Sequence, residues 1–286
     1  MRPNHKIMRK LLTILITTVI AIAFVSCKAR VKNEEVKKLP SRIVFCFDDE
    51  NSIWGFGEFF YDEQNRLIKV IQMGRRCLCY NCDAVNPPDD TLNIIYNSDG
   101  LLVKLTEGLY NFEITYLDNG KKIIVSCDDK NYWSNDTFWL NNKGQVIKSS
   151  DGLGHIWEHT YNSKGNISKQ RQYGLWWEDN YGQRHDYEFI NKVTYSRIRP
   201  VFRHVNTPEW FLFWLFEFWL SENLTIHPFQ KNGYLPFEKK YFDADGKYKS
   251  SKFTYELDTD NYVIKMKIKD TYFQEWNWGY QYILVK

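Results

Sequence analysis

Three cysteines stand close together in the stretch RRCLCYNCDA, residues 75–84, where Cys77, Cys79 and Cys82 form a C-x-C-x-x-C cluster. Three thiolates at this spacing can hold a zinc ion if a fourth ligand joins them, and Cys127 is a candidate for that place. Cysteines of exported proteins pair more often than they bind metal, which favours disulfides. The candidates for pairing are Cys46, Cys77, Cys79, Cys82 and Cys127, and at least one of these five thiols must stay unpaired.

A second motif, HIWEH from His155 to His159, matches the H-x-x-E-H pattern of zinc proteases. That pattern requires a helix, so that both histidines reach one metal ion. Here SSDGLG precedes the motif and TYNSKG follows it, which predicts a strand. Residues four apart on a strand lie about 13 Å from each other, too far for one zinc ion. We therefore expect no protease site, no other catalytic residues and no cofactor, since nucleotide loops and nucleophile elbows are also missing.

Two adjacent tryptophans, Trp176 and Trp177, lie in the polar stretch YGLWWEDNYGQRHDY. Adjacent residues of a strand point to opposite faces, so at most one of them can enter a core there. An exposed tryptophan is suited to packing against a sugar ring. Both residues are therefore candidates for contact with a glycan ligand.

The N-terminus predicts export and a lipid anchor. A basic leader precedes an uncharged run from Leu11 to Phe24, which is too short for a permanent membrane span. The run ends in Val25, Ser26 and Cys27, which resembles the lipobox of bacterial lipoproteins, and we expect Cys27 to carry acyl chains. Translation can start at Met1 or at Met8.

This N-terminus sets the expected organisation of the chain. Residues 1–26 form a lipoprotein signal peptide, residues 27–40 form the lipidated cysteine with a charged tether, and residues 41–286 form a single β domain. Cleavage before Cys27 leaves 34 basic against 35 acidic residues, a formal net charge of −1, so we expect no nucleic-acid partner. The expected location is the outer membrane, on a face that the sequence leaves open.

Seven similar segments predict that the domain is mainly β. Each begins with an aromatic residue or Leu and has Gly or Asn at its fifth place, where a tight turn needs positive φ. The segments start at Tyr61, Tyr96, Tyr116, Leu140, Tyr161, Phe242 and Leu257. Alternating residues follow each turn, which indicates antiparallel hairpins.

One segment differs from these repeats. NTPEWFLFWLFEFWLSEN, residues 206–223, predicts a helix near 207–222, with Thr207 as N-cap, Pro208 at the first helical position and Glu209 in the first turn. Nearly all of its faces are apolar, so it must be buried, and it is too short to cross a bilayer.

The turns resemble the YD-type repeats of Rhs-like proteins. Together with the lipobox and the apolar helix, they are similar to a Bacteroides-type lipoprotein family, whose domain of unknown function is described as porin-like in fold. The likeness covers Ser41 to Lys286. It implies a large, strongly curved antiparallel sheet, a half-barrel-like meander of hairpins, wrapped around the buried helix. It implies no activity, and the cysteine cluster is not part of the family's pattern.

These observations lead to three expectations of function. The first is a lipid-anchored cell-envelope protein with a non-enzymatic binding or scaffold role. The alternatives are a glycan-binding accessory lipoprotein and an envelope hydrolase. The expected partners are the membrane, through the lipid anchor, and a glycan or another envelope protein.

Overall fold

The computed structural model describes residues 36–47, 53–74, 90–129, 135–152, 154–178, 184–216, 231–242, 248–271 and 275–285. The chain divides into two compact units, Met1–Lys37 and Lys38–Lys286. The second unit begins with the first strand, at Lys38.

The described part of the second unit contains sixteen strands. The first eight are β1 (Lys38–Phe47), β2 (Ile53–Tyr61), β3 (Leu67–Gly74), β4 (Asp90–Tyr96), β5 (Leu102–Glu107), β6 (Tyr110–Leu117), β7 (Lys122–Cys127) and β8 (Asn135–Leu140). The other eight are β9 (Val146–Ser150), β10 (Ile156–Tyr161), β11 (Ile167–Glu178), β12 (Arg184–Tyr195), β13 (Pro236–Phe242), β14 (Tyr248–Leu257), β15 (Val263–Asp270) and β16 (Glu275–Leu284). A 3₁₀ turn, η1 (Asp118–Gly120), joins β6 to β7.

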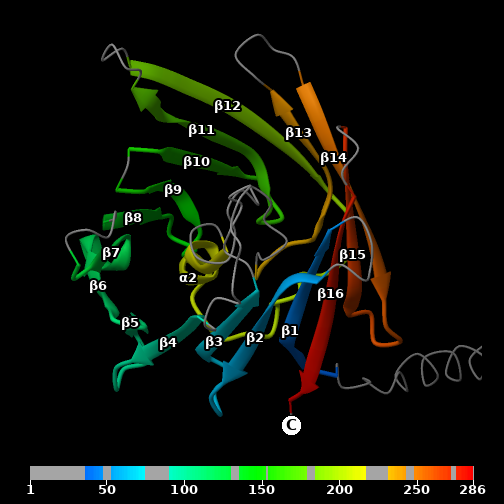
Figure 1. The fold of residues 1–286 in the computed structure, drawn as a ribbon, viewed down its shortest axis with the longest axis horizontal. Coiled ribbons are helices and arrows are strands. Elements are labelled where there is room, and N and C mark those ends of the chain that lie inside the picture. Colours follow the sequence, from blue (N-terminus) through cyan, green and yellow to red (C-terminus); the bar gives the residue numbers. More distant parts are fainter. Residues whose placement is uncertain are drawn as a thin grey trace, which may run out of the picture. The chain divides into compact units, whose positions relative to one another are not determined.

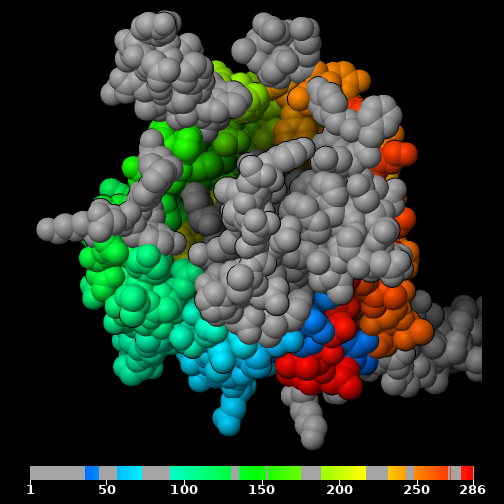
Figure 2. Space-filling model, viewed as in Figure 1, coloured from blue at the N-terminus to red at the C-terminus, as the bar shows by residue number. Residues whose placement is uncertain are grey.

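The strands form a closed barrel in which each strand pairs antiparallel with its neighbours in the chain (Figure 1). Figure 2 shows the strand colours following one another around the same ring. The prediction of a mainly β, antiparallel meander is confirmed, but the half-barrel is wrong. β1 pairs with β16 from Lys38↔Leu284 to Phe47↔Trp276, so the two edges of the sheet satisfy each other's backbone groups. An open half-barrel would leave both edges unpaired.

The predicted turns are confirmed at six of the seven segments, and the seventh fifth-place residue, Gly246, lies outside the described residues. The six fifth-place residues all have positive φ: Asn65, Gly100, Gly120, Gly144, Gly165 and Asn261. In five of these turns the Asp or Asn after the first residue accepts two backbone N–H groups through Oδ1. Asp62, for example, accepts from Gln64 and Arg66, both at 2.9 Å. The side chain thus fixes the reversal that the glycine or asparagine permits.

The helix α2 (Glu209–Trp214) lies inside the ring of strands (Figure 1). Its aromatic side chains contact the inner faces of several strands: Trp210 lies against Phe138 of β8, and Trp214 against Phe112 of β6. Leu215 and Phe216 continue it as a π-type turn. The prediction of a buried apolar helix is confirmed for 209–216, and the predicted part from 217 to 222 lies outside the described residues.

The predicted start of this helix is wrong by one residue. Pro208, not Thr207, is the N-cap, with an extended backbone at φ −56° and ψ 139° and no side-chain capping bond. Thr207 is fully buried, and its hydroxyl is committed to β3 and β4 instead. Glu209 lies in the first turn, as predicted.

Candidate functional site

The meander gives the barrel two different ends. At the turn end lie the connections β2–β3, β4–β5, β6–β7, β8–β9, β10–β11 and β14–β15, together with the long segment from β12 to β13 that carries α2. At the loop end lie the connections β1–β2, β3–β4, β5–β6, β7–β8, β9–β10, β11–β12, β13–β14 and β15–β16. The candidate residues from the sequence divide between these ends and the barrel interior.

The strand ends that carry or flank the cysteine candidates lie at the loop end. Cys46 is the second-last residue of β1 and Cys127 is the last residue of β7, and both strands finish at this end. Cys77, Cys79 and Cys82 lie outside the described residues, in the connection that leaves β3 at the same end. Topology therefore brings the strand ends that flank all five thiols to one end of the barrel. The choice between disulfides and zinc stays a prediction.

Cys127 is the one cysteine whose side chain the structure describes. It is a free, partly buried thiol, and burial raises its pKa. A raised pKa keeps the thiol protonated and less nucleophilic at neutral pH. Cys27, the predicted lipidation site, lies outside the described residues.

Trp176 and Trp177 also belong to the loop end, near the last residue of β11. The register of β11 against β12 shifts between Leu175 and Trp177, so Trp176 is the extra residue of a β-bulge. Their side chains are outside the described part of the structure. Their role in glycan binding stays a prediction.

Residues 156–159 of the HIWEH motif form the start of β10, so the predicted strand is confirmed for them. His159 and Trp157 face inward and are buried. His155, just before the strand, contacts Asp151 through Nδ1 at 2.5 Å. The histidines are therefore held in different surroundings, as expected of residues four apart on an extended backbone.

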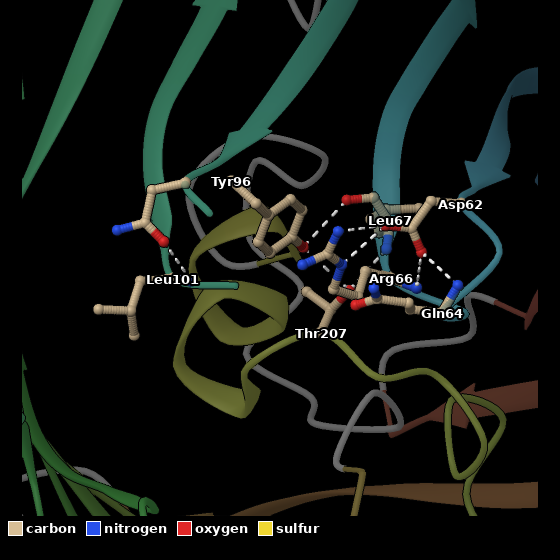
Figure 3. Close-up of polar contacts among 8 residues, drawn as sticks. Asp62, Gln64, Arg66, Leu67, Tyr96, Leu101 and Thr207 are labelled. Atoms are coloured by element: carbon tan, nitrogen blue, oxygen red, sulfur yellow. Dashed lines mark hydrogen bonds and ion pairs between the residues drawn. The ribbon is translucent and has the colours of Figure 1, made fainter. Parts of the chain in front are cut away.

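The turn end is fastened to the helix-bearing segment through Thr207 (Figure 3). The Thr207 hydroxyl accepts a hydrogen bond from the backbone N–H of Leu67 at 2.7 Å and lies 3.3 Å from the hydroxyl of Tyr96. Beside it, Arg66 forms an ion pair with Asp62 at 2.7 Å and covers the ring of Tyr96, 4.5 Å from its centroid. The backbone N–H of Asn206 also donates to the carbonyl of Asn65 at 2.8 Å. These contacts hold the segment that precedes α2 against the β2–β3 and β4–β5 turns.

A belt of seven tyrosines runs around the turn end. Each stands at or near the end of an even-numbered strand and donates its hydroxyl to the carbonyl oxygen at or near the start of the preceding strand. The pairs are Tyr61–Pro40, Tyr96–Leu67, Tyr116–Leu102, Tyr161–Val146, Tyr195–Ile167, Tyr255–Pro236 and Tyr282–Val263, at 2.6 to 3.0 Å. Burial raises the pKa of Tyr96 and Tyr116 to about 12, which keeps these hydroxyls protonated as donors. In β8 the equivalent place is Leu140, which has no hydroxyl.

The inner wall is divided into an apolar and a polar part. On β1 to β7 the fully buried inward side chains are mostly aliphatic or aromatic, such as Ile43, Leu92 and Phe112. On seven consecutive strands, β8 to β14, they include one polar side chain each. We call this set the polar interior face: Asp136, Ser149, His159, Gln170, Asn191, Lys239 and Ser251.

Three neighbouring pairs within the polar interior face are directly opposite each other in register. His159 faces Gln170, and Gln170 faces Asn191, whose amide donates to Gln170 Oε1 at 3.1 Å. Lys239 faces Ser251, and its ammonium group lies 4.6 Å from the centroid of the Tyr241 ring. Within the described part of the chain, Ser149 Oγ and Asn191 Oδ1 have no hydrogen-bond partner.

The charge state of this face follows from its burial. Burial, and then the positive charge of Lys239, lower the pKa of His159 to about 3. His159 is therefore neutral at physiological pH, and its ring packs against Phe213 of α2 at 5.2 Å between centroids. Asp136 accepts a hydrogen bond from the indole N–H of Trp214 at 2.8 Å. The face combines donors and acceptors suited to holding a polar group, with two of its side chains also contacting α2.

Sequence reasoning missed both the polar interior face and the tyrosine belt. The belt had a signal, since four of the seven repeat segments begin with a belt tyrosine. The polar face had a weaker one: His159 lies two residues before Tyr161, and therefore on the same side of β10. Gln170, Asn191 and Lys239 have no such marker.

Among the described residues, no group of three or more His, Cys, Asp and Glu side chains could hold a metal ion. In the same part of the chain, no helix has the length and apolar character needed to cross a membrane.

Comparison with known proteins gave structural neighbours alone. No protein-family model matches the chain, and no curated protein matches it either. A porin-like protein from Bacteroides uniformis is 11% identical, with a TM-score of 0.37, over 85% of this chain and 98% of that one. A porin-like protein from Bacteroides vulgatus is 10% identical, with a TM-score of 0.40, over 86% and 99%. The Tc holotoxin pore of Photorhabdus luminescens is 10% identical, with a TM-score of 0.25, over 80% of this chain and 11% of that one.

Proposed function

We propose that this chain is a lipid-anchored protein of the outer membrane, in which a plugged barrel serves as a non-enzymatic scaffold for binding. The observation that carries this proposal is the polarity of the wall. On β1 to β7 the inward side chains that surround α2 are mostly apolar, whereas charged side chains such as Arg171 and Glu188 face outward on the wall.

The outward face of β10 to β12 illustrates this polarity. Arg171 of β11 pairs with Glu188 of β12 at 2.8 Å and with Glu158 of β10 at 3.5 Å. On β14, Lys252, Thr254 and Glu256 are exposed, in alternation with inward side chains. A charged side chain that faces lipid at the bilayer midplane costs about 2–4 kcal/mol, and a spanning barrel carries an apolar outer band instead. The outer wall thus favours attachment by an anchor over insertion of the barrel.

The interior supports the scaffold role. The side chains of α2 and of the π-type turn after it fill the space between facing strands. The ring centroids of Phe216 and Phe59 of β2 are 6.2 Å apart, and on the other side the ring of Phe213 contacts His159 of β10. A helix fixed by such contacts, and by Thr207 at the turn end, makes the barrel a packed body. Such a body can hold the strand ends at its loop end in a constant arrangement, from which the connections extend.

Acylation at Cys27 is tested by expressing the full chain in a bacterium that processes lipoproteins. We expect the intact mass to fit a mature chain that begins at Cys27 with added acyl chains, and the protein to sediment with membranes. Cys27→Ser should lose the added mass and leave the membrane fraction, whereas Cys127→Ser, the matched control, should keep both. An unacylated wild-type protein, or conducting pores in planar bilayers, would contradict the proposal.

The binding role is tested at the loop end through the two tryptophans of β11. Affinity electrophoresis against a panel of polysaccharides should show retardation that Trp176→Ala/Trp177→Ala abolishes. Tyr110→Ala, an exposed aromatic at the same end, is the control. Retardation that is unchanged in the double variant rules out a glycan site at these residues and leaves the scaffold role.

A further inference from the structure

An arc of exposed apolar side chains surrounds the turn end on the outside of the barrel. On β2, β3, β4 and β6 these are Phe60, Ile68, Ile95 and Leu117. On β13, β14, β15 and β16 they are Phe237, Leu257, Ile264 and Ile283. Their exposed fractions range from 37% for Ile68 to 54% for Phe237.

The arc is a consequence of the tyrosine belt. Most of its members are next in sequence to a belt tyrosine or to the residue whose carbonyl accepts the tyrosine hydroxyl, as Phe60 is to Tyr61 and Phe237 is to Pro236. Because neighbours on a strand point to opposite faces, an inward belt residue places its neighbour outside. Seven of the eight side chains are placed outside in this way, near one level of the barrel and close to the turns. Leu257, two residues after Tyr255, is the last residue of β14 and is exposed beside the β14–β15 turn.

The arc is interrupted on one side. On β10, β11 and β12 the equivalent positions are Thr160, Ser168 and Thr194, which are polar. Ile147 of β9 is the last exposed aliphatic residue before this gap. β1 lies within the arc, between β16 and β2, and its first residue, Lys38, is at the turn end. The chain thus enters the barrel on the apolar side of the rim.

We propose that this arc is a membrane-contact surface. Its side chains contact the same bilayer into which the acyl chains of Cys27 insert. This inference rests on the proposed lipid anchor and names the partner of the turn end. Ten residues lie between Cys27 and Lys38, so an extended tether keeps the rim within about 40 Å of the anchor. Tethering makes a weak contact effectively intramolecular, and half-exposed side chains are then sufficient to hold it.

The chemistry of the rim fits the interface of a bilayer. The turns beyond the arc are polar, as in the sequences DEQNR from Asp62 and DTDNY from Asp258, and suit the headgroup layer. Apolar side chains behind them gain by leaving water at the boundary with the acyl chains. The polar gap at β10 to β12 means that one side of the rim meets the membrane, which predicts a tilted barrel with its loop end pointing away.

Photocrosslinking tests this orientation. The full acylated protein is reconstituted into vesicles of phosphatidylethanolamine and phosphatidylglycerol that contain a small fraction of a diazirine phospholipid. We expect lipid adducts on peptides that carry Phe60, Ile95, Phe237 and Ile264, and none on peptides that carry Leu109 or Tyr248 of the loop end. In the variant Ile95→Ser/Phe237→Ser/Leu257→Ser/Ile264→Ser, the adduct yield at the rim should fall roughly tenfold. Leu109→Ser/Tyr248→Ser, which changes exposed apolar residues at the other end, should leave the yield unchanged.

A second sample separates this inference from the lipid anchor. The mature chain is given an N-terminal hexahistidine tag before residue 28 and is held on vesicles with a nickel-chelating lipid, so that acylation is not needed. Rim adducts should appear in this sample too, even if the intact mass shows that Cys27 of the expressed protein is unacylated. Adducts shared equally by both ends, or crosslinks between two copies of the chain at the rim in place of lipid adducts, would overturn the inference.

Discussion

The hydroxyl of Tyr96 donates a hydrogen bond to the carbonyl oxygen of Leu67 at 3.0 Å, which joins the end of β4 to the start of β3. The same arrangement recurs in seven of the eight consecutive strand pairs, so that one end of the barrel is bound by side chains as well as by the sheet. A tyrosine that points inward also fixes which residues of its strand face the helix and which face solvent, because neighbouring residues alternate between the two faces.

Tyr96→Phe should destabilise the barrel by about 1 kcal/mol, the usual net contribution of one internal hydrogen bond. The buried ring stays in place, so the loss is confined to the hydroxyl and its two contacts. The measurement is the free energy of unfolding in urea. Tyr248→Phe, at an exposed position of the loop end, is the control and should be neutral. Equal effects of the two substitutions would show that the belt adds nothing to stability.

Thr207→Val should cost more than Tyr96→Phe. Valine keeps the shape of threonine but leaves the buried N–H of Leu67 without its acceptor, which costs about 1–3 kcal/mol. Thr207→Ser keeps the acceptor and should lose less. In the double variant Thr207→Val/Tyr96→Phe the two losses should not add, because the hydroxyls share one network. Strict additivity of the unfolding free energies would contradict the network.

The sequence predicted the parts of the fold that depend on local backbone chemistry. Asn65, Gly100 and Gly165 were identified because positive φ is a property of the single residue. The helix was identified because its faces are apolar from Trp210 to Phe216. Its start was misplaced because Thr207 has a stronger partner in Leu67, 140 residues away in the chain, than in its own helix.

Closure of the barrel and the polar interior face could not be predicted in the same way. Closure depends on the pairing of β1 with β16, which lie at opposite ends of the domain's sequence. Nothing in the sequence of either strand identifies the other as its partner. The polar face forms because each of seven strands turns one polar residue towards the interior. Gln170 and Asn191 look like ordinary surface residues until the inward direction of β11 and β12 is known. Long-range pairing decides both features.

His159 should make the barrel sensitive to acid. Burial and Lys239 lower its folded pKa to about 3, whereas the unfolded chain has the ordinary value near 6.5. Between these values the unfolded state binds more protons, so the contribution of His159 is fully present above pH 6.5 and is lost as the pH falls towards 3. The slope should approach about 1.4 kcal/mol per pH unit. It is measured as the difference between wild type and His159→Gln in urea unfolding at several pH values.

Removing the charge of Lys239 tests whether His159 causes this pH dependence of the unfolding free energy. Lys239→Met removes one of the two causes that lower the pKa of His159, so the folded pKa should rise, the loss of stability should stop at a higher pH, and its total should be smaller. Burial remains, so the dependence should not vanish. If wild type, His159→Gln and Lys239→Met give parallel curves between pH 7 and pH 4, His159 is not the group that titrates.

The strand order predicts that no disulfide joins Cys46 to Cys127. β1 and β7 are six strands apart in the barrel, and neighbouring strands are about 4.8 Å apart, so the two residues lie on the order of 25 Å from each other across the barrel. A disulfide needs Cα atoms about 4.4–6.8 Å apart. Peptide mapping of the unreduced protein by mass spectrometry should find no Cys46–Cys127 peptide, and any bridge to either residue should lead to Cys77, Cys79 or Cys82. The reduced sample is the control. A Cys46–Cys127 bridge in the folded monomer would contradict the strand order itself, because no local shift of β1 or β7 closes a gap of that size.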